Sequence, residues 1–126
     1  MGYRSDVMIA FYPANEGRPK RVPYAAIKLW FEENYPQDAG EVVFYPERET
    51  ITVRYYDTKW YDGYGEVQEV NRAIEKYREA FACDEEEHLA NYEFVRIGEE
   101  YNDIEVERSG WHDFRLSVER SIHTRF

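Results

Sequence analysis

The sequence of 126 residues contains one cysteine, Cys83, and only three histidines. A single cysteine excludes an internal disulfide and any zinc site built from several cysteines. The histidines His88, His112 and His123 are 24 and 11 residues apart, so none forms the short-spaced pairs of helical zinc or di-iron sites. No apolar run is long enough to span a bilayer, and the N-terminal region lacks the apolar segment of a secretory signal. We therefore expect a cytoplasmic protein that binds no metal or other cofactor.

Catalytic signatures are also missing. No serine lies in a Gly-x-Ser-x-Gly context, and Gly63 and Gly65 are not followed by the Lys-Ser/Thr of a phosphate-binding loop. Cys83 precedes four acidic residues at the predicted end of a helix, where negative charge and the helix dipole both raise the pKa of a thiol. His112 and Asp113 are adjacent, and adjacent side chains on a strand point to opposite faces. The sequence therefore favours a protein that is not an enzyme.

Positive charge is scarce: 16 basic residues stand against 26 acidic ones, for a formal net charge of -10. Only residues 1–30 carry a net positive charge. A field of this sign repels a nucleic-acid backbone and attracts basic protein surfaces, so we expect no direct binding of DNA or RNA. Solubility alone is the competing interpretation of the acidic excess. The densest acidic stretches contain Asp84, Glu85, Glu86, Glu87, Glu99, Glu100, Asp103, Glu105 and Glu107.

Apolar residues at helical spacing predict two helices. Pro23 suits the first position of one helix, and the Tyr35-Pro36 pair ends it, because the residue before a proline avoids helical geometry. The second helix carries an apolar stripe from Val67 to Phe81, with charged residues on its other faces.

Alternating patterns predict six strands. Residues 6–12 are apolar on both alternating sets, which is typical of a strand covered on both faces or near an interface. In residues 50–56, apolar side chains alternate with Thr52, Arg54 and Tyr56, which predicts one solvated face. The remaining predicted strands cover 42–45, joined to 50–56 by a turn at 46–49, and then 92–97, 103–107 and 114–119.

The resulting order, β-α-β-β-α-β-β-β, predicts a single α+β domain spanning residues 1–126. Its first six elements match the split β-α-β arrangement of ferredoxin-like folds, and the last two strands would extend the sheet. We expect an antiparallel or mixed sheet with both helices on one face. This arrangement hosts many unrelated activities, so the fold does not indicate the function.

The strongest single feature of the sequence is the loop that contains Trp60, Tyr61, Asp62 and Tyr64, which we call the aromatic loop. Tyrosine and tryptophan offer large contact area at low entropy cost and dominate interface hot spots, so the loop predicts a surface that binds a basic partner. The alternative is that the rings only cover the sheet edge and the start of the second helix. The predicted contact residues of this loop are Trp60, Tyr61, Asp62 and Tyr64.

Two segments resemble small accessory proteins of tailed bacteriophages and prophages. These are the opening Met1-Gly2-Tyr3-Arg4-Ser5-Asp6-Val7 and the stretch 94–105, which contains Phe94-Val95-Arg96-Ile97-Gly98 and Asp103-Ile104-Glu105. The resemblance implies a protein that acts in the host cytoplasm. Proteins of this class commonly inhibit host enzymes or defence systems, including CRISPR effectors, and several do so through acidic surfaces that mimic nucleic acid.

The resulting hypothesis is a non-enzymatic phage inhibitor that binds a host nucleic-acid-binding protein. Its carboxylates would stand in for phosphates and meet lysines and arginines that otherwise hold DNA or RNA, with the Trp60-Tyr61 loop as an apolar anchor. Two alternatives stay open. One is a homo-oligomeric structural protein of a phage, and the other is a small metal-dependent enzyme acting on nucleotides or nucleic acids. The sequence does not say whether the acidic residues share one face, which the inhibitor hypothesis requires.

Overall fold

Two interlocked β-α-β units form four of the five strands of the main sheet. The computed structural model orders its strands β2-β3-β1-β4-β5, and every neighbouring pair is antiparallel. Each unit is split, because β3 lies between β1 and β2, and β1 lies between β3 and β4. The predicted ferredoxin-like α+β arrangement is therefore confirmed. The elements are β1 (Ser5–Pro13), α1 (Tyr24–Asn34), β2 (Glu41–Tyr45), η1 (Pro46–Arg48), β3 (Thr50–Thr58), α2 (Gly65–Ala80), β4 (Ala90–Gly98) and β5 (Ile104–Arg108).

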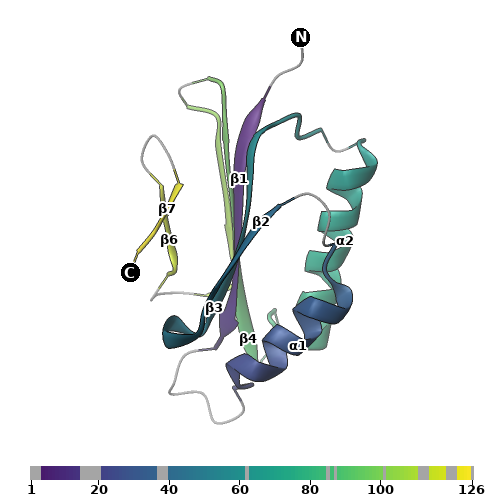
Figure 1. Cartoon of the computed structure of the whole chain (residues 1–126), viewed down its shortest axis with the longest axis vertical. Helices are drawn as coiled ribbons and strands as arrows, with labels where there is room; N and C mark the ends of the chain where they lie inside the picture. The colour runs from purple at the N-terminus through teal and green to yellow at the C-terminus, as the bar shows by residue number, and fades with distance from the viewer. Residues whose placement is uncertain are drawn as a thin grey trace.

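The structure describes residues 4–14, 21–36, 40–61, 63–84, 86, 88–100, 102–110, 114–118 and 122–125. Within these ranges both helices cover one face of the main sheet, which we call the helix face (Figure 1). This confirms the prediction that both helices share a face. The opposite face is partly covered by a short two-stranded sheet, and we call it the hairpin face (Figure 1).

The central strand β1 is buried on both faces, as its two apolar sets predict. Val7, Ile9 and Phe11 pack into the core under the helices. The alternate residues, among them Met8 and Tyr12, pack into a second cluster on the hairpin face. Both sets are apolar because a strand between two covering layers has no solvated side.

The helices bury the residues that their periodicity marks. Ile27 and Phe31 of α1 are buried, and Tyr77 of α2 is fully buried with its hydroxyl donating to the Asn91 carbonyl at 2.7 Å. Pro23 lies one position earlier than predicted: it is the extended residue just before α1 rather than its first helical residue. Proline is tolerated here because no hydrogen bond within the helix uses the N–H of the residue at this position.

The predicted turn between β2 and β3 forms as the short 3-10 helix η1. Glu49 closes it in the left-handed region, with φ of 51°, and its N–H donates to the Pro46 carbonyl. The turn leads β3 back alongside β2 in the antiparallel register Phe44↔Ile51 and Val42↔Val53.

The last predicted strand forms but does not extend the main sheet. Only β5 adds to the main sheet, whereas β6 (Leu116–Val118) pairs with β7 (Ile122–Thr124) in a separate hairpin. Leu116 and Ile122 are buried against the hairpin-face side chains of β1 and β4. The reason is that Leu116 and Ile122 are buried when the hairpin packs over this face of the sheet. The same side chains would lack that contact in a sixth strand at the edge of the sheet. β7 is too short to give a periodic signal.

The hairpin also overturns the predicted solvated face of β3. Thr52 is buried, and the Arg54 guanidinium donates to the carbonyl of Ile122 in β7 at 3.0 Å. The polar side chains of β3 therefore meet the hairpin, and only Tyr56, at the far end of the pattern, is exposed.

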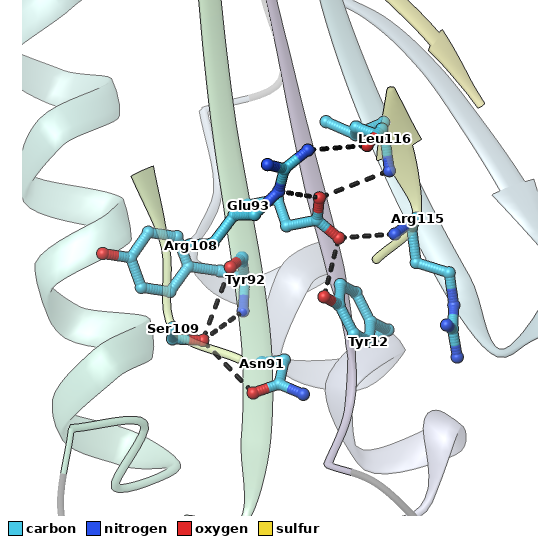
Figure 2. Close-up of polar contacts among 8 residues, drawn as sticks. All are labelled: Tyr12, Asn91, Tyr92, Glu93, Arg108, Ser109, Arg115 and Leu116. Atoms are coloured by element: carbon cyan, nitrogen blue, oxygen red, sulfur yellow. Dashed lines mark hydrogen bonds and ion pairs between the residues drawn. The ribbon is translucent and has the colours of Figure 1, made fainter. Parts of the chain in front are cut away.

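A buried carboxylate fastens the hairpin to the main sheet. Glu93 of β4 is fully buried and forms an ion pair with Arg108 of β5 at 2.9 Å (Figure 2). Its two oxygens also accept hydrogen bonds from the Tyr12 hydroxyl at 2.6 Å and from the backbone N–H groups of Arg115 and Leu116 at 2.6 and 3.3 Å. Arg108 completes the arrangement by donating to the Leu116 carbonyl. A buried charge needs such partners, and two of them, the N–H groups of Arg115 and Leu116, lie at the start of β6.

Candidate functional site

A groove of about 630 Å³ lies between α2 and the β4–β5 end of the sheet. Five residues that the sequence predicts as partner contacts line it: Trp60, Tyr61, Asp103, Glu105 and Glu107. The structure thus brings together the aromatic loop and part of the acidic set, although more than forty positions separate them in the chain.

Strand register places the charged side chains in the groove. Arg96 of β4 is opposite Glu105 of β5, and Phe94 is opposite Glu107. Alternate residues of a strand share a face, so these four side chains lie together on the helix face. Helix α2 supplies the facing wall, in which Glu75 and Arg78 are the charged members.

Arg96 holds two of the predicted acidic residues. Its guanidinium lies 2.8 Å from an Asp103 oxygen and 2.9 Å from a Glu105 oxygen, and it also donates to the Ser5 hydroxyl at 3.0 Å. Hydrogen bonds to Asp103 are the main reason that the pKa of Arg96 is raised above its ordinary value. The Arg96 side chain is only 15% exposed, whereas that of Glu105 is 60% exposed.

Arg78 likewise pairs with two of the predicted acidic residues, at the other end of β5. It pairs with Asp84 at 2.6 Å and lies 3.8 Å from Glu107. The Tyr92 hydroxyl donates to Glu107 at 2.8 Å. The pKa of Tyr92 is raised, mainly because the phenol is buried and secondly because of this hydrogen bond. The Glu107 side chain is 56% exposed, against 36% for Arg78.

These contacts place the carboxylates outside and the guanidinium groups beneath them. We call Asp84, Asp103, Glu105 and Glu107 the acidic strip. Four carboxylates against the two guanidinium groups of Arg78 and Arg96 leave a formal charge of about −2, counting full charges on each. The strip is therefore partly neutralised, but the groups that a visiting molecule meets first are acidic.

The aromatic loop divides between core and surface. Trp60 packs between Tyr55 and Phe94, with ring centroids 5.4 and 6.1 Å apart, and contacts the main core. Tyr61 and Tyr64 form an edge-to-face pair at 5.1 Å, and Tyr64 is exposed. Trp60 thus packs against the core and is at the same time a wall of the groove. Tyr64 lines a second cavity, of about 590 Å³, between β3 and α2.

The other predicted acidic residues do not join the groove. Glu99 accepts a hydrogen bond from the backbone N–H of Arg4, Glu100 belongs to the turn between β4 and β5, and Glu86 is exposed beyond α2. Asp62, Glu85 and Glu87 lie outside the described residues.

Sequence reasoning missed Glu75, Arg78, Phe94 and Arg96. Arg96 has a recoverable signal: a lone basic residue in a strand next to a strand with alternating acids. Its partners depend on register, which the sequence does not specify.

Two groups considered for chemistry are structural. The pKa of the Cys83 thiol is raised to about 12, mainly by burial and secondly by the negative charge of Asp84. The direction of this shift is the predicted one. The imidazole of His88 is buried and hydrogen-bonded through Nδ1 to the Cys83 carbonyl at 2.7 Å. Among the residues that the structure describes, no three His, Cys, Asp or Glu side chains gather as a metal ion requires.

Comparisons with protein-family models, with curated proteins and with solved structures found no significant match to this chain. In the described part of the chain, neither helix has the length and apolar character to cross a membrane.

Proposed function

We propose that this protein is a binding protein whose groove between α2 and β5 takes a basic surface of a partner protein. The observation that supports the proposal is the layering of charge, with Glu105 and Glu107 outside Arg96 and Arg78. A partner lysine or arginine would meet the carboxylates first. Its aliphatic stem would then lie against the aromatic wall that Trp60 and Phe94 provide.

The two arginines support such binding rather than oppose it. Exposed ion pairs contribute only about 0–1 kcal/mol, so a partner cation can share the outer oxygens of Glu105 and Glu107 at little cost. Meanwhile Arg96 and Arg78 hold these side chains in place, which reduces the entropy lost when a partner binds.

The partner that we propose is a host nucleic-acid-binding protein, such as a CRISPR effector or another defence nuclease. Proteins of this class present lysine and arginine where phosphates bind, and carboxylates can occupy the same positions. The resemblance to small phage proteins leads to the same class of partner. In this proposal the protein inhibits by competition with nucleic acid and catalyses nothing.

The test compares two double variants that change the net charge equally. Glu105→Gln with Glu107→Gln removes the exposed acids of the groove. Glu33→Gln with Glu79→Gln removes two exposed acids at helix ends. Each tagged protein is used to capture host proteins at low and at high salt, and the captured proteins are identified by mass and then challenged with duplex DNA.

The expected result is a nucleic-acid-binding protein that the parent and the helix-end variant retain at low salt. High salt should release this protein, because ions screen exposed charge pairs. The groove variant should not retain it, because its acids are removed, and added duplex should compete for the same partner surface. Equal loss in both double variants would show a general charge effect and would count against the groove.

A metal-dependent enzyme would also need a concave site with converging acids, and the groove has that shape. Its carboxylates, however, are engaged by Arg78 and Arg96 in the contacts described above. An enzyme should turn over nucleotides when divalent metal is added, and the Glu105→Gln variant should abolish that turnover.

A further inference from the structure

The outer edge of β5 is open. β5 is the last strand in the sheet order, and in the described part of the chain no other strand pairs with its outer side. Hydrogen bonds from Gly98 N–H to the Asp103 carbonyl and from Ser109 N–H to the Tyr92 carbonyl bracket the β4–β5 ladder. Because bonded and non-bonded pairs alternate, Glu105 and Glu107 direct their main-chain groups to β4. Those of Val106 and Arg108 therefore point outward.

The two faces of β5 differ in chemistry. Ile104 and Val106, two apolar side chains on one short strand, are 42% and 44% exposed. They continue the hairpin face, where they are opposite Ile97 and Val95 of β4. On the helix face, Glu105 and Glu107 border the groove. A strand added at this edge would thus meet apolar side chains on one face and carboxylates on the other.

A second copy of this chain does not suit the edge. Antiparallel pairing of two β5 strands about Val106 places Glu105 opposite Glu107 of the other copy, twice. Pairing about Glu105 places that residue opposite itself. Like charges directly opposite one another destabilise a strand pair.

The other edge of the sheet offers no comparable site. On the helix face of β2, the Phe44 ring packs against Phe31 at 6.0 Å and is covered by the Lys28 ammonium at 5.4 Å. That edge therefore presents a cation where β5 presents carboxylates.

We infer that β5 receives an extended segment of the partner as a sixth strand, with lysine or arginine on its groove side alternating with apolar residues. This inference rests on the proposed function and specifies how the basic partner binds. Main-chain hydrogen bonds to Val106 and Arg108 would provide affinity, and the alternation would provide specificity.

The test uses a short synthetic peptide in which valine and lysine alternate, and a second peptide of the same composition with the lysines in one block. Affinities are measured by fluorescence anisotropy against the parent protein and Val106→Pro. Proline is tolerated on an edge strand where the N–H faces solvent, so this variant should fold while blocking the edge.

The alternating peptide should bind the parent roughly tenfold more tightly than the block peptide, and Val106→Pro should lose that advantage. An alternating peptide N-methylated on the edge-facing amides should bind the parent like the block peptide, which tests the idea without any change to β5. If both peptides bind the parent equally and Glu105→Gln with Glu107→Gln weakens both, strand addition is overturned. The proposed function would still stand. Absence of binding by either peptide at low salt would count against both. A dimer of the parent that Val106→Pro dissociates would replace the partner segment with a second copy.

Discussion

The two faces of the main sheet are held by different forces. Under the helices, the core is aromatic: the Phe11 ring lies 4.7 Å from Tyr77, 5.8 Å from Tyr35 and 5.9 Å from Phe31. On the hairpin face, the apolar cluster is small, and β6 and β7 contribute only Leu116 and Ile122 to its buried part. There the fully buried Glu93 accepts four hydrogen bonds, and two of them, from the backbone N–H groups of Arg115 and Leu116, tie the hairpin to the sheet.

This difference follows from the size of the covering layer. Two helices bring enough apolar area to hold their face by packing, which has no directional requirement. A hairpin of two three-residue strands brings little area, so its position depends on directional bonds to one carboxylate. Damage to the helix face should thus unfold the whole domain, whereas damage to Glu93 should act mainly on the hairpin.

The largest expected effect is that of Phe11→Ala. Removing this buried ring leaves a cavity among several aromatic neighbours and should lower the free energy of unfolding by about 3–5 kcal/mol. Urea unfolding followed by circular dichroism would measure the loss. Leu29→Ala is the control, because Leu29 is exposed on α1 and its loss should stay within about 0.5 kcal/mol. A similar small effect of Phe11→Ala would refute the aromatic core as the main source of stability.

A smaller and more local effect is expected from Glu93→Gln. All four groups that bond to Glu93 are donors, so an amide NH₂ would face a donor wherever it lies, and Arg108 would lose its charged partner. Hydrogen bonds to charged groups contribute about 1.5–3 kcal/mol, which sets the size of the loss.

Hydrogen exchange would locate the effect of Glu93→Gln. Amides of β6 and β7 should exchange faster, while those of α1 and α2 stay protected. Glu79→Gln, at an exposed position near the end of α2, is the matched control and should change neither region. Uniform acceleration across both faces would mean that the hairpin and the helices unfold as one unit.

The smallest effect concerns alkaline pH. Burial raises the pKa of Tyr12, Tyr35 and Tyr77 above the ordinary value of 10.0, and the charge of Glu93 raises that of Tyr12 further. In the unfolded chain these phenols ionise near pH 10, so their contribution to stability is complete below that pH and declines above it.

Titration of the urea midpoint between pH 8 and roughly 11, with tyrosinate absorbance in parallel, would measure this decline. Tyr12→Phe should make it shallower, because one of the three phenols is then missing. A midpoint that stays constant as tyrosinate appears would show that the buried phenols ionise without unfolding.

The sequence was sufficient for both helices, for the strands other than β7, and for the topology of the main sheet. The double apolar pattern of β1 predicted a strand covered on both faces, and the stripe of α2 predicted its buried side; both are confirmed. The hairpin face was harder to predict. Thr52 and Arg54 look like solvated positions because covering by β6 and β7 depends on residues more than sixty positions away.

The candidate site was predictable in part for the same reason. Asp103, Glu105, Glu107 and Trp60 were recognisable because carboxylates and indoles carry recognisable chemistry wherever they lie. Arg78 and Arg96, which hold the acidic strip in place, were missed because an arginine in a helix or strand has many alternative partners.

By itself, the sequence determined both helices, the strands other than β7, and the apolar sides of β1 and α2, because periodicity is a local property of the chain. Only the tertiary structure decided that β6 pairs with β7 rather than with β5. It also decided that Glu93 is buried among donors and that the acidic strip lies over two arginines. These outcomes depend on strand register and on competition for the same buried space, and both are settled between residues far apart in the chain.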